Sequence, residues 1–290
     1  MRLARVRTRD GSDLFALSVA DGGWVSVESL GVMARNTGEV IEALRGVDSS
    51  SLDGSSNSLE DVEFLNPIVP PTKLLAIGLN YLDHINETKS KQPENPILFA
   101  KFPNSLNDPY GRIVVDPRLT ERGDYEVELA VVIGESTKGI SEDDALSCIF
   151  GYTVANDVSA RDWQRADGQF DRSKSFDTFC PIGPWITTTD QVPDPQGLPL
   201  RSWVNGELRQ DSSTKQMLFS VAYLIHYLAR GMTLEPGDVI LTGTPHGVGF
   251  AMEPPHYLEP GDVVACEVES LGRIEHEIVA PDGAYRARET

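Results

Sequence analysis

Cysteine is scarce in this 290-residue sequence, and its three copies, Cys148, Cys180 and Cys266, are odd in number and far apart. Neither a disulfide framework nor a zinc knuckle is indicated, and a reducing cytoplasm is the expected compartment. No run approaches the roughly 18 apolar residues of a membrane-spanning helix. The basic residues at positions 1–7 are followed by no apolar core of signal length. The sequence therefore predicts a soluble, unexported protein.

Positive charge is also in short supply, because 25 Lys and Arg residues against 44 Asp and Glu residues give a net charge of −19. Nucleic acid and anionic membrane surfaces repel such a field, so neither is an expected partner. An anionic small-molecule substrate would need a local cationic pocket. Arg161, Lys174 and Lys101 are the candidate cations for that pocket.

The chain is long enough for one large domain and a small one. Residues 46–60 are rich in Ser, Gly and Asp and are predicted to be a linker or loop. We therefore expect a small N-terminal α/β domain over residues 1–66, with a structural role, and a catalytic domain over residues 67–290. The second part has many short strands bounded by Gly, Pro or Asp turns and few helices, which predicts a β-rich α+β fold. Helices are expected over about residues 38–45, with Thr37 as the cap, and over about residues 214–229.

Carboxylates open one of the most apolar stretches of the sequence, residues 124–134, which reads DYEVELAVVIG. Branched apolar residues predict a buried strand, and strand side chains alternate between two faces. Glu126 and Glu128 should therefore share one face, and Val127, Leu129 and Val131 the other. Two neighbouring buried carboxylates either share a proton or hold a cation.

A third acid, Asp157, ends the next predicted strand in this region, residues 150–157. Three oxygen donors without a nearby Cys or His favour a hard cation, Mg²⁺ or Mn²⁺, over zinc. The alternative is a solvated strand edge, where Glu-x-Glu patterns are common. That alternative leaves the apolar run after Glu128 unexplained.

His84 and Glu87 are three residues apart in a short predicted helix between about residues 81 and 89. On a helix they lie on one face and can contact each other. A carboxylate orients an imidazole and raises its basicity, which makes a general-base pair. Exposed helices also carry such pairs by chance, and the residues alone favour that simpler explanation.

Six motifs in fixed order resemble the fumarylacetoacetate hydrolase family, in its branch of acylpyruvate hydrolases, oxaloacetate decarboxylases and diketo-deoxy-sugar-acid hydrolases. They are GLNY (78–81) with Asp83, His84 and Glu87; DYEVE (124–128); NDVSARD (156–162); KSFDTFCP (174–181); Gly183-Pro184; and TGTP (242–245) with Gly247 and Gly249. The resemblance spans about residues 70–280, so the first 65 residues lie outside it. It implies a mixed β-roll and a homodimer.

The resemblance also implies roles for individual residues. Glu126, Glu128 and Asp157 would bind the metal, and His84 with Glu87 would activate water. Lys174 would stabilise developing charge. Substrate contacts are expected from Tyr81, Lys101, Arg161, Gln164 and Thr244. The founding hydrolase has a fourth acidic metal ligand, but no acid occurs between Phe99 and Asp108, so three protein ligands are expected here. The loop around Thr244 lacks the lysine of a P-loop, and nucleotide binding is not expected.

A hard cation with open positions suits the carboxylate and 2-oxo group of a 2-oxo acid and stabilises an enolate grown on it. The first expectation is a hydrolase that cleaves the C–C bond of a 2,4-dioxo acid, such as an acylpyruvate or a diketo-deoxy sugar acid, to pyruvate and a carboxylic acid. The alternative is an oxaloacetate decarboxylase or a 2-hydroxymuconate-type isomerase or tautomerase. A catalytically silent binding protein is the third possibility, and the complete set of motif residues argues against it.

Overall fold

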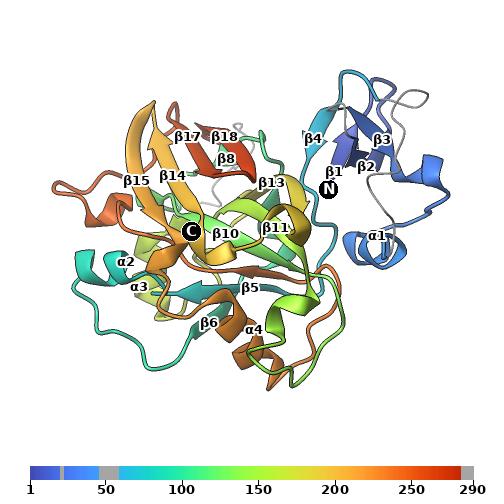
Figure 1. Ribbon diagram of the computed structural model, residues 1–290. Helices are drawn as coiled ribbons and strands as arrows, with labels where there is room; N and C mark the ends of the chain where they lie inside the picture. Colours follow the sequence, from blue (N-terminus) through green and yellow to red (C-terminus); the bar gives the residue numbers. More distant parts are fainter. Residues whose placement is uncertain (20–22, 46–58, 282–290) are drawn as a thin grey trace.

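Eleven of the described strands form one mixed sheet, in the order β3-β2-β1-β13-β11-β10-β16-β5-β6, with β4 paired to β1 and β7 paired to β13. The computed structural model in Figure 1 describes residues 1–19, 23–45 and 59–281. The strands of this sheet are β1 (Arg2–Arg7), β2 (Asp13–Ser18), β3 (Trp24–Ser26), β4 (Glu63–Leu65), β5 (Leu74–Gly78), β6 (Ile97–Ala100), β7 (Leu106–Asn107), β10 (Val127–Ile133), β11 (Ile149–Asn156), β13 (Cys180–Thr188) and β16 (Val239–Leu241).

A five-stranded sheet in the order β15-β14-β17-β18-β8 packs against the middle of the first sheet. Its strands are β8 (Ile113–Val114), β14 (Pro199–Val204), β15 (Glu207–Ser213), β17 (Val263–Val268) and β18 (Gly272–Val279). A two-stranded ladder joins β9 (Gly123–Asp124) to β12 (Ser159–Ala160). Many strands and few helices confirm the β-rich α+β class expected from the turn pattern.

The described helices are short. The α-helices are α1 (Thr37–Ala43), α2 (Leu82–Glu87), α3 (Arg161–Asp167) and α4 (Val221–Ala229). The 3-10 helices are η1 (Val27–Leu30), η3 (Pro103–Ser105), η4 (Ala145–Cys148), η5 (Thr189–Gln191), η6 (Pro195–Gly197), η7 (Thr214–Gln216) and η8 (Gly249–Ala251). Within the described ranges, no helix has the length and apolar character needed to cross a membrane.

Strand β10 separates two hydrophobic clusters, and this explains its continuous apolar sequence. Val127, Leu129 and Val131 pack on the side of β14, β17 and α4. Ala130 and Val132 pack on the opposite side with residues of β5, β13 and the N-terminal segment. Side chains of a strand alternate, so Glu128 belongs to the second side. The predicted division of this strand into two faces is confirmed.

The N-terminal strands continue the main sheet, because β1 pairs antiparallel with β13 through Arg2–Thr187 and Leu3–Ile186. In Figure 1 these blue strands lie at one side of the molecule beside β13. The predicted boundary after residue 66 therefore falls between strands of one sheet, and the division into two domains stays a prediction. Most of the predicted linker, residues 46–58, lies outside the described residues.

Two predicted helices begin elsewhere than expected. Asn36, and not Thr37, caps α1, since its side chain accepts a hydrogen bond from the backbone N–H of Glu39. The helix predicted over residues 214–229 is interrupted after η7, and α4 begins at Val221 with Ser220 as its cap. In both cases a side-chain oxygen that bonds a free N–H of the first turn sets the start.

Candidate active site

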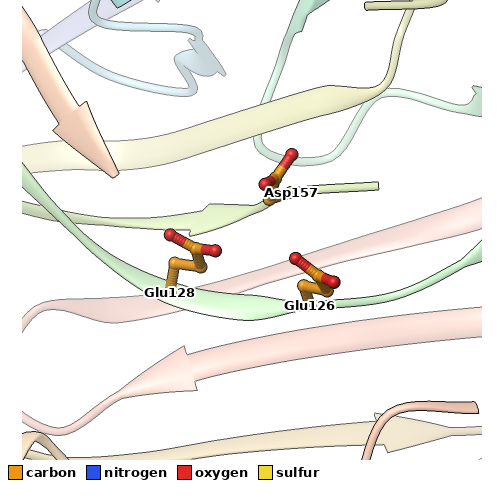
Figure 2. Close-up of side chains that lie close together, drawn as sticks. All are labelled: Glu126, Glu128 and Asp157. Carbon is orange, nitrogen blue, oxygen red and sulfur yellow. The ribbon is translucent and has the colours of Figure 1, made fainter. Parts of the chain in front are cut away.

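Glu126, Glu128 and Asp157 come together because β10 and β11 pair with Val127 opposite Asn156 and Glu128 opposite Ala155. One residue further on, Asp157 lies opposite Glu126, and its N–H bonds the Glu126 carbonyl at 2.9 Å. Each of the three offers a carboxylate oxygen within 4.8 Å of the other two. Figure 2 shows these carboxylates turned toward a common space. The structure thus brings the predicted acids together, and we call them the acidic triad.

Two buried lysines neutralise part of the acidic triad. Lys174 Nζ donates to Glu126 Oε2 and Asp157 Oδ2, each at 2.7 Å, and to Ser159 Oγ at 2.8 Å. Burial opposes the lysine charge, but Asp157 and Glu126 outweigh it and raise the pKa of Lys174. On the other side of Asp157, Lys101 Nζ donates to Oδ1 at 2.7 Å. Both carboxylate oxygens of Asp157 are therefore held by ammonium groups.

Arg161, the first residue of α3, reaches the acidic triad from another direction. Its Nη2 donates to Glu126 Oε1 at 2.5 Å and its Nε to Asp124 Oδ2 at 2.9 Å. Its Nη1 donates to Gln164 Oε1 at 3.1 Å, as expected for residues three apart on a helix. Burial raises the pKa of Glu126, but Lys174 and Arg161 more than reverse this and lower it to about 2.

Among the residues that the structure describes, Glu128 has no such cationic partner within hydrogen-bonding distance. Its Oε2 accepts from the backbone N–H of Gly243 at 2.7 Å. Burial, followed by the nearby charges of Asp157 and Glu126, raises the pKa of Glu128 well above its ordinary value. A neighbouring positive charge would remove this penalty.

The donor set fits a divalent hard cation on grounds of charge. Four buried carboxylates, those of Asp124 and the acidic triad, face three cations, of which Lys101 and Lys174 are buried and Arg161 is nearly buried. When Glu128 is ionised, the four negative and three positive charges leave one negative charge. A divalent ion would leave the cluster with one positive charge. A positive cluster of this kind would attract an anionic ligand even though the net charge of the protein is −19.

His84 and Glu87 lie in α2, as predicted. His84 Nδ1 is 3.4 Å from Glu87 Oε2, and the other oxygen of Glu87 accepts from the Gly247 N–H at 2.9 Å. The carboxylate therefore bridges α2 and the glycine-rich loop after β16. The His84 ring also packs edge-on against Phe250, with ring centroids 6.2 Å apart. These contacts hold the imidazole in place beside the acidic triad.

One cavity of about 290 Å³ joins the imidazole to the carboxylates. The predicted site residues that line it are His84, Glu126, Glu128, Arg161, Gln164, Lys174 and Thr244. Phe99, Phe170 and Phe250 supply apolar walls. The Thr244 hydroxyl bonds the Val127 carbonyl at 3.0 Å and the Gln210 side chain at 2.8 Å. Thr244 thus ties the glycine-rich loop to β10 as well as lining the cavity.

Two residues predicted to contact substrate, Lys101 and Tyr81, are not among the residues that line the cavity, and their substrate contacts stay a prediction. Lys101 is 1% exposed, and its ammonium group also donates to the carbonyls of Lys174 and Phe179. Its role is to position Asp157. Tyr81 is fully buried in the core cluster of β10 and α4. The motif pattern marked both residues without showing which way their side chains point.

Asp124 is a functional residue that sequence reasoning left without a role. Its Oδ1 accepts from the Gly249 N–H at 2.8 Å, and its Oδ2 accepts from Arg161 and from the Phe250 N–H at 3.1 Å. It therefore orients Arg161 and fixes η8. Its position at the start of residues 124–134 could have marked Asp124 as a candidate site residue. Only the β9–β12 pairing shows that it faces Arg161.

A β-rich fold in which an acidic triad, a buried lysine and a histidine meet around one cavity is typical of an enzyme with a candidate metal site, and comparison with known proteins gives the family. The family model described as fumarylacetoacetate (FAA) hydrolase C-terminal matches residues 73–279. The chain therefore belongs to the fumarylacetoacetate hydrolase family, as its motifs indicated.

Similar proteins extend the likeness beyond the matched region. The mitochondrial oxaloacetate tautomerase fahd2 of Xenopus laevis is 42% identical over 289 residues, which cover 96% of this chain and 90% of that protein. The solved fumarylacetoacetate hydrolase of Exiguobacterium antarcticum is 40% identical, with a TM-score of 0.86, and covers 97% of this chain and 100% of that one. The 2-hydroxyhepta-2,4-diene-1,7-dioate isomerase of Mycobacterium marinum is 33% identical, with a TM-score of 0.75, covering 97% and 98%.

Proposed function

We propose that this protein is a metal-dependent keto–enol tautomerase that acts on oxaloacetate or a related 2-oxo acid. The observation that carries the proposal is the cavity in which the acidic triad, Lys174 and His84 meet. The names of relatives support this reaction class, since one is an oxaloacetate tautomerase and another a dienedioate isomerase. Both names describe movement of a proton within a 2-oxo or 2-hydroxy acid skeleton.

The acidic triad would hold Mg²⁺ or Mn²⁺, because three carboxylate oxygens and no Cys or His suit a hard cation. When bound, such a cation supplies positive charge to the carbonyl and carboxylate oxygens of a 2-oxo acid, which favours the enol form. Our proposal takes this ion as the cofactor of the reaction.

The side chains of the cavity divide the remaining work. In the keto-to-enol direction His84 takes the proton from C3 and gives it to the oxygen on C2, and the reverse direction returns it to C3. Glu87 orients the ring through Nδ1. Lys174 faces the same cavity and offsets charge that develops on substrate oxygen. Arg161, held by Asp124 and Glu126, and its partner Gln164 receive a substrate carboxylate.

The test is exchange at C3. We expect the purified protein with Mg²⁺ to speed replacement of the C3 hydrogens of oxaloacetate by deuterium in D₂O, followed by NMR. It should also speed the disappearance of the enol ultraviolet absorbance. Chelation of the metal should stop both. Exchange no faster than in metal-matched buffer would reject the tautomerase.

Hydrolysis of a 2,4-dioxo acid is the second candidate, and the His84–Glu87 pair favours it. A histidine oriented by a carboxylate can take a proton from water, and the hydroxide can then attack the 4-oxo carbon. Release of pyruvate from acetylpyruvate measures this reaction, and release of CO₂ from oxaloacetate measures decarboxylation. Pyruvate release that outpaces C3 exchange would make hydrolysis the main activity.

The proposal includes a homodimer in the cytoplasm, as expected from the family resemblance and from the cysteine content. Sedimentation velocity at micromolar concentration would test the first point, and imaging of the untagged protein in its own cell would test the second. A monomer in solution would remove the dimer from the proposal.

A further inference from the structure

A second cavity adjoins the first and is larger, at about 570 Å³. The residues common to both cavities are Arg161, Gln164, Phe170 and Phe250. A molecule bound beside the acidic triad can therefore extend past Arg161 into this second space, which we call the arginine groove.

Three arginines line the arginine groove, and the fold explains why they gather. The β9–β12 pairing sets Asp124 opposite Ser159 and Gly123 opposite Ala160. Arg122 and Arg161 come next on either side, joined by a backbone hydrogen bond of 3.0 Å from the Arg161 N–H to the Arg122 carbonyl. Arg165 follows Arg161 by one turn of α3, on the same face.

Arg122 and Arg165 differ from Arg161 in their ion pairs with carboxylates. Arg161 is nearly buried and makes ion pairs with Asp124 and Glu126. Arg122 and Arg165 are exposed, and neither makes an ion pair with any residue that the structure describes. Arg122 lies over the ring of Tyr257 at 6.0 Å from its centroid. Two uncompensated cations thus stand beside the site of a strongly acidic protein.

The rest of the arginine groove is apolar or aromatic. Phe170 and Phe250 form the wall nearest the acidic triad, and Pro255 and Tyr257 line it further out. Such walls suit a chain of carbon atoms, while the arginines suit an anion at the end of that chain.

We propose that the arginine groove is a distal-carboxylate subsite, in which Arg122 and Arg165 bind the far carboxylate of an extended 2-oxo dicarboxylic acid. This inference rests on the proposed function, because it takes the reacting end of the acid to lie at the acidic triad. Arg122 and Arg165 are then specificity residues for long dicarboxylic acids over acids of the same length with a neutral end.

The test compares two ligands that differ only at the far end. The ligands are 2-oxoheptanedioate and its C7 monoamide, titrated by calorimetry into the Mg²⁺-loaded full chain. We expect the dicarboxylate to bind about tenfold more tightly or better, as charge-assisted hydrogen bonds to guanidinium groups imply. The double variant Arg122→Ala/Arg165→Ala should bring the ratio of the two affinities close to one.

Arg230→Ala is the matched control, since it removes the same charge from an exposed arginine at the end of α4, outside both cavities. Its affinity ratio should equal that of the unaltered protein. The single variants Arg122→Lys and Arg165→Lys keep the charge and should keep most of the preference. They also serve if the double variant fails to fold.

Several results would overturn the subsite. They are a ratio near one in the unaltered protein, a ratio unchanged in the arginine variants, or no binding of either acid. The proposed function is tested separately, by hydrogen–deuterium exchange at C3 of oxaloacetate. Arginine-dependent preference without exchange would keep the subsite and reject the tautomerase, and exchange without preference would do the reverse.

Discussion

Glu128 Oε2 accepts a hydrogen bond of 2.7 Å from the backbone N–H of Gly243, which is a neutral donor. In the described part of the chain, no lysine or arginine donates a hydrogen bond to this carboxylate, in contrast to those of Glu126 and Asp157. The other two acids each receive at least two cationic hydrogen bonds. The triad is therefore asymmetric: Lys174 and Arg161 lower the pKa of Glu126, whereas burial raises the pKa of Glu128, which ionises at a cost that a metal ion can offset.

Glu128→Gln should remove metal binding while leaving the metal-free protein as stable as before or more so. The amide resembles the protonated acid in shape and carries no charge into the buried site. In the unaltered protein, Mg²⁺ at a hundred times its Kd should stabilise by about 2.7 kcal/mol, which is a rise in Tm of several degrees. Thermal unfolding with and without Mg²⁺ measures both effects, and Glu207→Gln on exposed β15 is the control. A normal metal-induced rise in Tm of the Glu128→Gln variant would contradict the assignment.

Metal affinity should increase with pH, and binding should release protons. The raised pKa of Glu128 means that its carboxyl must lose a proton before it can coordinate. The same raised pKa contributes stability to the metal-free protein at low pH, and this contribution is lost as the pH rises through it. Calorimetry in buffers of different ionisation enthalpy counts the protons. Binding that is independent of both buffer and pH would show that Glu128 is already ionised.

Lys174→Met should destabilise the metal-free protein by about 3–5 kcal/mol, the usual cost of leaving buried charges unpaired. Glu126 and Asp157 both lose a hydrogen bond of 2.7 Å to its ammonium group. Saturating Mg²⁺ should recover part of the loss, because it supplies positive charge to the same oxygens. Denaturant unfolding with and without the metal checks this. Lys215→Met, at an exposed position, should change little, and an equally small effect at Lys174 would contradict the ion-pair geometry.

His84→Ala should lower the rate of C3 exchange by about 10²- to 10⁴-fold, the usual contribution of a general base. The metal-induced rise in Tm should persist, since the imidazole bonds Glu87 and not the acidic triad. Hydrolysis of a 2,4-dioxo acid, if present, should fall more than decarboxylation of oxaloacetate. His226→Ala, in α4, controls for a general loss of packing. Equal loss of all activities together with metal binding would show that His84 has a structural role only.

Gly243→Ala should weaken metal binding as well as folding. Gly243 has a φ of 97°, and an added Cβ would lie 2.9 Å from the Asn80 Cβ and 3.0 Å from the Ile77 carbonyl oxygen. A non-glycine residue in such a conformation costs about 1–3 kcal/mol. Relief of this strain would move the Gly243 N–H that donates a hydrogen bond to Glu128. Mg²⁺ titration of the folded variant measures the loss, and Gly206→Ala, which has positive φ but open space, separates strain from contact.

The strands that carry the acidic triad could be predicted because the alternation of polar and apolar residues along each strand depends only on the local sequence. Alternation along residues 126–131 fixes two faces, and the apolar face must be buried. The meeting of Glu126 with Asp157 depends on the register of β10 with β11, which composition does not determine. The order of the motifs gave the family resemblance that suggested this contact, and the strand register explains how the contact forms.

The positions of lysine ammonium groups could not be predicted. Lys101 and Lys174 both lie near the triad in the fold, yet one faces the core and the other the cavity. A long side chain can reach either way from the same backbone, and only the carbonyls of Val158, Lys174 and Phe179 show why Lys101 turns inward. The prediction of one helix over residues 214–229 was wrong because of another side-chain hydrogen bond. The Ser220 hydroxyl accepts from the Tyr223 N–H, so the α-helix begins only after Ser220.

The pairing of β1 with β13 leaves two strands, β13 and β11, between the first residues of the chain and β10. Were β1 removed, β13 would present unpaired N–H and C=O groups along part of its length, and open edges of this kind template aggregation. Removal of β1 is therefore expected to lower the solubility of the protein, because it exposes an edge of the same sheet that carries the acidic triad.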